Sequence, residues 1–122
     1  MAQYMLMCCQ PEVDPAEQEE DDAGMAMLHE LHRNLRAAGI LVDVQRLRSV
    51  ESATSVRVRD GQTEITDGPF AVTKESLAGY YLVECADLDE AIKVASSLTG
   101  ASSGTIEVRP VIPPAEWSDD PA

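Results

Sequence analysis

The sequence predicts an α+β fold in which two helices cover one face of an antiparallel sheet. Two observations lead to this prediction. First, segments whose composition and apolar spacing are typical of strands alternate with segments in which apolar residues recur at helical spacing. Their order along the chain is strand, helix, strand, hairpin, strand, helix, strand. No repeat or linker divides the 122 residues, so we expect one domain over 1–112 and a flexible acidic tail over 113–122.

The first strand and the first helix have clear patterns. In residues 2–9 (AQYMLMCC), apolar side chains occupy both alternating sets, which indicates a strand buried on both faces. A helical period then runs from Asp14 to Gly39. Its apolar stripe consists of Met25, Leu28, Leu31, Leu35 and Ala38. At about 100° per residue, His32 lies on the edge of this stripe and His29 lies toward solvent.

Residues 41–47 predict the second strand, and an insertion follows it. In residues 53–68, two valines alternate with two arginines up to an Asp60-Gly61 turn, which is typical of a β-hairpin.

A strand, a helix and a last strand complete the order. Residues 79–86 are aromatic and β-branched, as strands prefer. Asp87 and Glu90 predict a capping box for a helix that ends at Gly100. Its expected apolar stripe consists of Leu88, Ala91, Ile92, Ala95 and Leu98. Alternating residues over 104–112 predict the final strand.

This order is the ferredoxin-like arrangement with an inserted β-hairpin. Two helices on one face leave the other face of the sheet uncovered. Because the first strand is apolar on both faces, the open face needs burying. We therefore expect a homodimer that forms through this face.

The net charge of −13 limits the classes of partner. It repels phosphate backbones and anionic lipids, so we expect no direct nucleic-acid binding and no membrane docking. We also expect no signal peptide and no membrane span, since no apolar run is long enough.

The cysteines indicate neither disulfides nor a metal. Cys8, Cys9 and Cys85 are odd in number and lack metal-ligand spacing. We expect free thiols in the reducing cytoplasm. There is no phosphate loop, nucleophile elbow or dinucleotide fingerprint, so we predict no cofactor.

The segment DGPFAVTKES, residues 67–76, combines a corner with charge. Gly68-Pro69 predicts a turn that Asp67 can stabilise, and Phe70 can anchor the loop in the core. Lys74 and Glu75 could complete a ligand site together with Asp67 and Phe70. The alternative is a surface ion-pair cluster of little energetic consequence.

These residues carry a family resemblance. The stretches DGPFA, TKE, LDEA and EVRP, with YMLM at the start, closely resemble the DGPF-domain branch of the YCII-related proteins. The resemblance covers nearly the whole chain to about Val111. There are two departures: Val72 stands where the family usually has Glu, and Ala78 where it usually has Gly.

The resemblance implies a ferredoxin-like fold that dimerises through its sheet, in the dimeric α+β barrel superfamily, with clefts between sheet, helix and second subunit. In YCII-related proteins generally, a His–Asp pair is the proposed acid/base site. The superfamily includes a dehydrochlorinase of chlorinated aromatic breakdown. DGPF-type genes often lie near sigma-factor genes, and the resemblance supplies no substrate.

His32 is the candidate acid/base, because imidazole titrates near neutral pH. The alternative is a histidine at the core boundary satisfied by a hydrogen bond. Asp67 is the preferred carboxylate partner, since it stands in the family motif. Asp43, on the strand after the histidine helix, ranks a little below it, and its alternative is an edge-strand charge.

Further candidates could hold a ligand. Glu107 and Arg109 share one face of the last strand, and Arg109 could bind a carboxylate; the alternative is an ion pair. Tyr80 and Tyr81 point to opposite faces, and Tyr81 is a candidate to line a pocket.

Two functions remain open. The first is a cofactor-independent enzyme of elimination or isomerisation type, with His32 as acid/base, Asp67 or Asp43 orienting it, and Lys74 or Arg109 holding an anionic group. The second is a non-catalytic ligand-binding or regulatory dimer linked to a sigma-factor or biosynthetic pathway.

Overall fold

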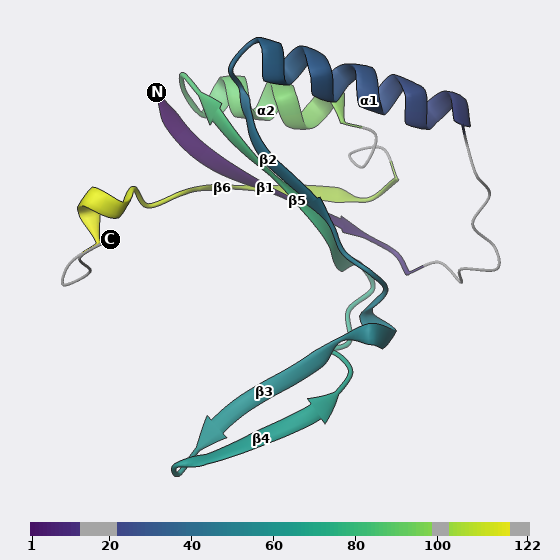
Figure 1. Cartoon of the computed structure of the whole chain (residues 1–122), viewed down its shortest axis with the longest axis vertical. Coiled ribbons are helices and arrows are strands. Elements are labelled where there is room, and N and C mark those ends of the chain that lie inside the picture. Colours follow the sequence, from purple (N-terminus) through teal and green to yellow (C-terminus); the bar gives the residue numbers. More distant parts are fainter. Residues whose placement is uncertain (13–21, 99–102, 118–122) are drawn as a thin grey trace.

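A computed structural model describes residues 1–12, 22–98 and 103–117 (Figure 1). The order of elements confirms the predicted α+β arrangement. The strands and helices are β1 Ala2–Gln10, α1 Asp22–Ala37, β2 Leu41–Arg46, β3 Thr54–Arg59, β4 Gln62–Asp67, β5 Ser76–Cys85, α2 Leu88–Ser97 and β6 Thr105–Pro110. Two 3₁₀ helices, η2 Val50–Ser52 and η3 Pro114–Glu116, lie in the connections.

The main sheet has the strand order β2-β5-β1-β6, and every neighbouring pair is antiparallel. Both helices lie on one face of this sheet, as Figure 1 shows. This topology is ferredoxin-like, as the sequence predicts. The insertion β3–β4 forms a separate two-stranded sheet.

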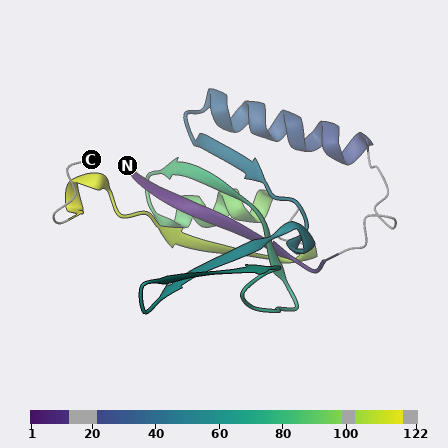
Figure 2. The ribbon, with the colours of Figure 1, turned by 60° about the horizontal axis from the view of Figure 1, so that its bottom comes forward.

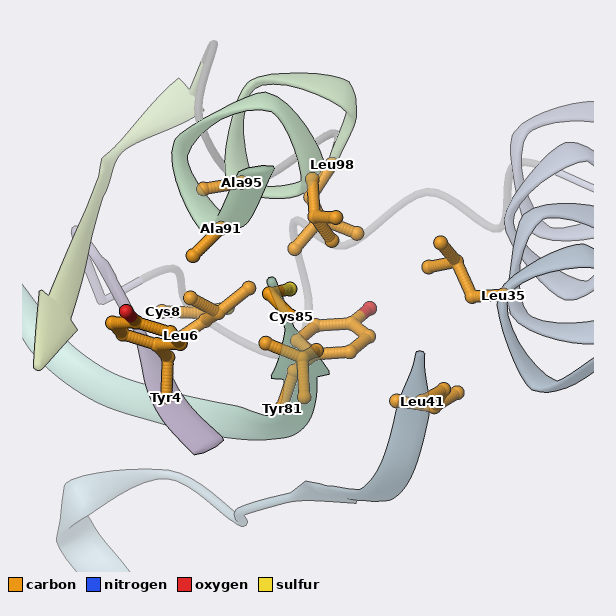
Figure 3. Close-up of a cluster of buried hydrophobic side chains, with 12 residues drawn as sticks. Tyr4, Leu6, Cys8, Leu35, Leu41, Tyr81, Cys85, Ala91, Ala95 and Leu98 are labelled. Carbon is orange, nitrogen blue, oxygen red and sulfur yellow. The ribbon is translucent and has the colours of Figure 1, made fainter. Parts of the chain in front are cut away.

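The core lies between the helices and one face of β1 and β5. Side chains alternate along both strands, so every second residue is buried under the helices. The buried cluster contains Tyr4, Leu6, Cys8, Leu35, Leu41, Tyr81, Val83, Cys85, Ala91, Val94, Ala95 and Leu98. Figure 3 shows Tyr81 between the side chains below α2 and those of Leu35 and Leu41. On the opposite face of β1, Met5, Met7 and Cys9 are half-buried.

The helix α1 packs with the predicted stripe, and it ends earlier than expected. Leu35 is buried and Leu31 packs against the core, whereas Ala38 follows the helix and is exposed. Gly39 has a φ of 76°, the left-handed conformation that glycine supplies at helix ends. The expected helix start at Asp14 lies outside the described residues.

The helix α2 begins with the predicted cap. The Asp87 carboxylate accepts a hydrogen bond from the Glu90 N–H at 2.9 Å, and the Glu90 carboxylate accepts one from the Ala86 N–H at 3.2 Å. The stripe is rotated from the prediction. Leu88 and Ile92 are 47% and 46% exposed, and Val94 is buried instead. Ala91, Val94 and Ala95 are all buried, so this side of the helix faces the sheet. The expected end at Gly100 lies outside the described residues.

The β3–β4 hairpin projects from the body as an arm (Figure 1). From a second direction, it again lies on the side of the molecule away from α1 (Figure 2). Asp60 and Gly61 both have positive φ, as the predicted two-residue turn requires. One face of the arm presents Val56, Val58 and Ile65 to solvent. The arm therefore has no core of its own.

At the C-terminal end, the segment that we expect to be a flexible tail contains the 3₁₀ helix η3, Pro114–Glu116. The Trp117 indole N–H donates a hydrogen bond to the Ile112 carbonyl at 2.9 Å, next to η3. No helix among the described residues is long and apolar enough to cross a membrane.

Candidate functional site

A cavity of about 300 Å³ lies between α1 and the helix-facing side of the sheet. The residues that line it are Cys8, Gln10, Met25, Leu28, His32, Val44, Gln45, Arg46, Leu47, Ala78, Gly79, Tyr80, Tyr81 and Leu98. Its walls combine apolar side chains with a few polar groups, which is typical of small-molecule sites.

The strand register explains why the sheet is hollow here. Gly79 pairs with Arg46 of β2 on one side and with Cys8 of β1 on the other. A Cβ atom at this glycine would lie 2.5 Å from the Gln45 carbonyl oxygen and 3.3 Å from the Arg46 Cα. Only glycine fits, and the missing side chain leaves space above the sheet.

His32 and Tyr81 meet in this cavity. Nε2 of His32 lies 2.8 Å from the Tyr81 hydroxyl oxygen, and the two rings are 5.3 Å apart in an edge-to-face arrangement. Tyr81 comes from the central strand β5, whereas His32 stands on the edge of the apolar stripe of α1. The predicted position of His32 thus brings it to the site, and its partner there is a phenol.

The surroundings keep both side chains neutral near pH 7. Burial lowers the pKa of His32 from its ordinary value of 6.5, and the charges of His29 and Arg36 lower it further. Burial raises the pKa of Tyr81, and Cys8 adds to this rise, whereas Arg46 opposes it. A neutral imidazole can accept a proton while a neutral phenol donates a hydrogen bond.

Asp43 belongs to the other face of the sheet. Its carboxylate accepts a hydrogen bond from the Tyr80 hydroxyl at 3.2 Å and one from the Gln45 side-chain amide at 3.4 Å. The hydrogen bond to Asp43 is the main cause that raises the pKa of Tyr80. Because Tyr80 and Tyr81 point to opposite faces, as predicted, Asp43 does not meet His32.

The DGPF segment lies at the base of the arm and does not line the cavity. Asp67 ends β4, paired with Thr54. The Gly68 N–H donates to the Ala53 carbonyl at 2.7 Å, and the Gly68 carbonyl accepts from the Ser55 hydroxyl at 2.8 Å. Hydrogen bonds to the N–H and the carbonyl of Gly68 therefore hold this turn, and Asp67 is not brought to His32.

The predicted burial of Phe70 is wrong, because its side chain is 82% exposed. Val72 is 96% exposed, and Lys74 is exposed as well, while Glu75 is half-buried. The loop projects with the arm instead of folding onto the core, so no core surface is within reach of the ring.

Glu107 and Arg109 lie on the open face of the sheet. Ile106 and Val108 pack against the core, so the residues between and after them point away from the helices. Glu107 pairs with Met7, and Arg109 pairs with Met5. Neither residue reaches the His32 cavity.

Cys9 marks a second charged region on the open face. Burial raises its pKa first, and the carboxylates of Glu107 and Glu75 raise it further. Such surroundings disfavour the thiolate. In the described part of the chain, no group of three or more His, Cys, Asp or Glu side chains could hold a metal ion.

Three features of the site were missed in the sequence. They are the Tyr81 hydroxyl as the partner of His32, Gly79 as the floor of the cavity, and Arg46 at its rim. Each depends on the register between β1, β2 and β5. A glycine in the middle of an otherwise aromatic strand was the available signal.

Comparison with known proteins identifies one family over this structure. The sequence model of the YCII-related domain matches residues 4–117. The chain is also 41% identical over 112 residues to an uncharacterized protein of Rhizobium meliloti (strain 1021), and the match covers 88% of this chain and 90% of that relative.

Proposed function

This chain belongs to the YCII-related domain family, and on that premise we propose that it is a small-molecule enzyme that moves protons without a cofactor. His32 and Tyr81 are its acid/base pair. The observation that carries this proposal is the 2.8 Å contact between the two side chains inside a ligand-sized cavity.

One tautomer of His32 suits the chemistry best. When Nε2–H donates its hydrogen bond to the Tyr81 oxygen, the phenol proton is free to bond a substrate oxygen. Nδ1 is then an acceptor that can take a proton. The lowered pKa of His32 keeps this neutral form available at neutral pH.

The reaction that we propose begins with a C–H bond next to a carbonyl group. Nδ1 of His32 removes the proton, and the electron pair of that bond moves into an enolate. The Tyr81 hydroxyl donates a hydrogen bond to the enolate oxygen. Return of the proton at another carbon is an isomerisation, whereas departure of a β-substituent with its electron pair is an elimination.

In this proposal the partner of His32 is the Tyr81 hydroxyl, whereas the sequence predicts a carboxylate, Asp67 or Asp43, in that role. Asp67 lies at the end of β4, where it pairs with Thr54, and the Asp43 carboxylate is hydrogen-bonded to Tyr80. A phenol can orient the imidazole through its oxygen and stabilise the enolate with the same hydroxyl. We therefore give neither carboxylate an acid/base role within one subunit.

The test is incorporation of solvent deuterium. Small carbonyl compounds are incubated in D₂O with the protein, and mass spectrometry measures the deuterium that each compound gains. We expect at least one compound to exchange with the wild type and not with His32→Gln. His29→Gln is the matched control, since His29 is exposed and outside the cavity. No exchange above the His32→Gln background would contradict the proposal.

A homodimer through the open sheet face accompanies this function. The half-buried residues Met5, Met7 and Leu82 on that face favour a second copy as its cover. The three cysteines are free, which fits the cytoplasmic location that we propose.

A specific observation favours the alternative of a non-catalytic binding or regulatory dimer. The arm exposes the paired residues Val56 and Ile65, and the loop at its base exposes Phe70 and Val72. An apolar surface of this kind is typical of protein interaction sites. Under this alternative, a substitution such as Phe70→Ser abolishes function in cells, whereas His32→Gln has no effect.

A further inference from the structure

The His32 cavity contains a cation that the acid/base pair does not use. Among the described residues that line the cavity, Arg46 alone has a permanent charge. We infer that Arg46 binds a carboxylate of the substrate, so that the ligand is a small organic acid. This inference rests on the proposed function and names the substrate class of the same site.

The register directs Arg46 toward the cavity. Val44 packs against the core opposite Tyr81, and Arg46 follows it by two positions on β2. Side chains two apart on a strand share a face. Arg46 therefore lies on the helix-facing side, diagonal to Tyr81 and next to Gly79, which has no side chain, and it lines the cavity.

Arg46 is available for a ligand. Within the described part of the chain, its guanidinium makes no hydrogen bond or ion pair, although its charge acts on Tyr81. The planar guanidinium presents paired N–H groups that match the two oxygens of a carboxylate. A carboxylate held there leaves the rest of the molecule to extend across Gly79 toward the phenol.

Arg46 also borders a neighbouring cavity of about 490 Å³, where the formal charges of the lining residues cancel. Two carboxylates, Glu12 and Glu51, line that cavity together with a second arginine, Arg48. Glu12 already accepts hydrogen bonds from the Ser49 hydroxyl at 3.1 Å and the Val50 N–H at 3.2 Å. The described lining of the His32 cavity contains Arg46 and no carboxylate that would repel an anion, so the side of Arg46 that faces His32 is the better place for a substrate carboxylate.

Because the net charge of the protein is negative, a preference for an anionic ligand can be attributed to a cation in the site. At −13, the chain repels anions in general. Without a local cation, a neutral amide should bind at least as well as the matching carboxylate. A preference for the carboxylate requires a cation in the site. The cavity volume of about 300 Å³ restricts the ligand to a small molecule.

Paired probes test this inference by NMR titration. The probes are benzoate, phenylacetate and crotonate, each compared with its primary amide, and the imidazole signals of His32 report binding. For at least one pair, we expect the wild type to bind the carboxylate about tenfold more tightly than the amide. Arg46→Met should abolish the preference, and Arg46→Lys should reduce it.

Arg48→Met is the matched control. It removes the same charge two residues away, and Arg48 lines only the neighbouring cavity. We expect it to keep the preference for carboxylates. If Arg46→Met does not fold, Arg46→Lys and Arg48→Met decide, since Arg46→Lys keeps the charge and loses the planar fork.

Equal binding of carboxylates and amides to the wild type would overturn the inference, and so would equal loss in the Arg46 and Arg48 variants. The carboxylate site and the acid/base function can fail independently of each other. If binding depends on Arg46 but no compound gains deuterium, the acid/base proposal fails and the carboxylate site stands. If deuterium exchange occurs without a preference for carboxylates, the reverse holds.

Discussion

Nε2 of His32 lies 2.8 Å from the hydroxyl oxygen of Tyr81, across 49 residues of sequence. This contact joins the first helix to the central strand β5 at a cavity. It satisfies a polar group on each of two side chains that border the core. It also sets a proton acceptor beside a hydrogen-bond donor, which is the arrangement that our proposed chemistry uses.

Tyr81→Phe should separate these two roles. Loss of the hydroxyl removes one hydrogen bond, so we expect the free energy of unfolding to fall by about 1 kcal/mol, measured by urea denaturation. The rate of deuterium exchange should fall roughly 100-fold. Tyr4→Phe is the control: Tyr4 is buried but outside the cavity, and its substitution should leave the exchange rate unchanged.

The pH dependence follows from the lowered pKa of His32. The unfolded chain, with the ordinary pKa of 6.5, binds the proton first as the pH falls. The free energy of unfolding should therefore decrease as the pH drops below 6.5 and level off once the folded His32 is protonated. Above 6.5 this contribution is constant.

His32→Gln should remove that contribution, so the difference between wild type and variant isolates it from the carboxylates. NMR titration of the imidazole signals gives the pKa directly. The exchange rate should persist below pH 6.5 and then fall as His32 becomes protonated. A pKa of His32 above 6.5 would contradict the effect of burial.

Gly79→Ala should damage both the sheet and the cavity. Its Cβ would lie 2.5 Å from a backbone oxygen that cannot rotate away. We expect a loss of about 1–3 kcal/mol in the free energy of unfolding and weaker binding of benzoate. Gly61→Ala provides a comparison, because that glycine has positive φ but open space around it. It should cost about 1 kcal/mol through backbone strain and leave binding intact.

The open sheet face gives a prediction about assembly. We expect light scattering to report twice the chain mass of 13.2 kDa for the wild type. Met7→Glu would place a carboxylate on the open face opposite Glu107, and we expect it to yield monomers. Met27→Glu, at an exposed position of α1, should remain dimeric. A monomeric wild type would rule out the dimer.

Much of the fold was readable from local patterns. A run that is apolar on both faces predicts β1, and aromatic and β-branched composition predicts β5. Helical spacing predicts α1, and the Asp60-Gly61 turn predicts the arm. These features depend on residues close in sequence. The predicted stripe of α2 is less accurate. The helix turns Val94 toward the core and leaves Leu88 and Ile92 exposed, and this rotation depends on tertiary packing that hydrophobicity alone does not encode.

The site was only partly readable. The stripe predicts a histidine at the border of the core, and His32 lines the cavity. Its partner depends on a contact between α1 and β5 that no local pattern encodes. The family motif favours Asp67 as the partner, but in the structure this motif lies at the base of the arm. Arg46 and Gly79 become neighbours only through the register of β2 with β5.

The most direct test of the central claim compares deuterium incorporation into one exchanging compound by the wild type, His32→Gln, Tyr81→Phe and His29→Gln at the same pH. The account predicts exchange by the wild type and His29→Gln, a large decrease with Tyr81→Phe, and none with His32→Gln. Equal rates for the wild type and His32→Gln would contradict the claim that His32 and Tyr81 act as the acid/base pair.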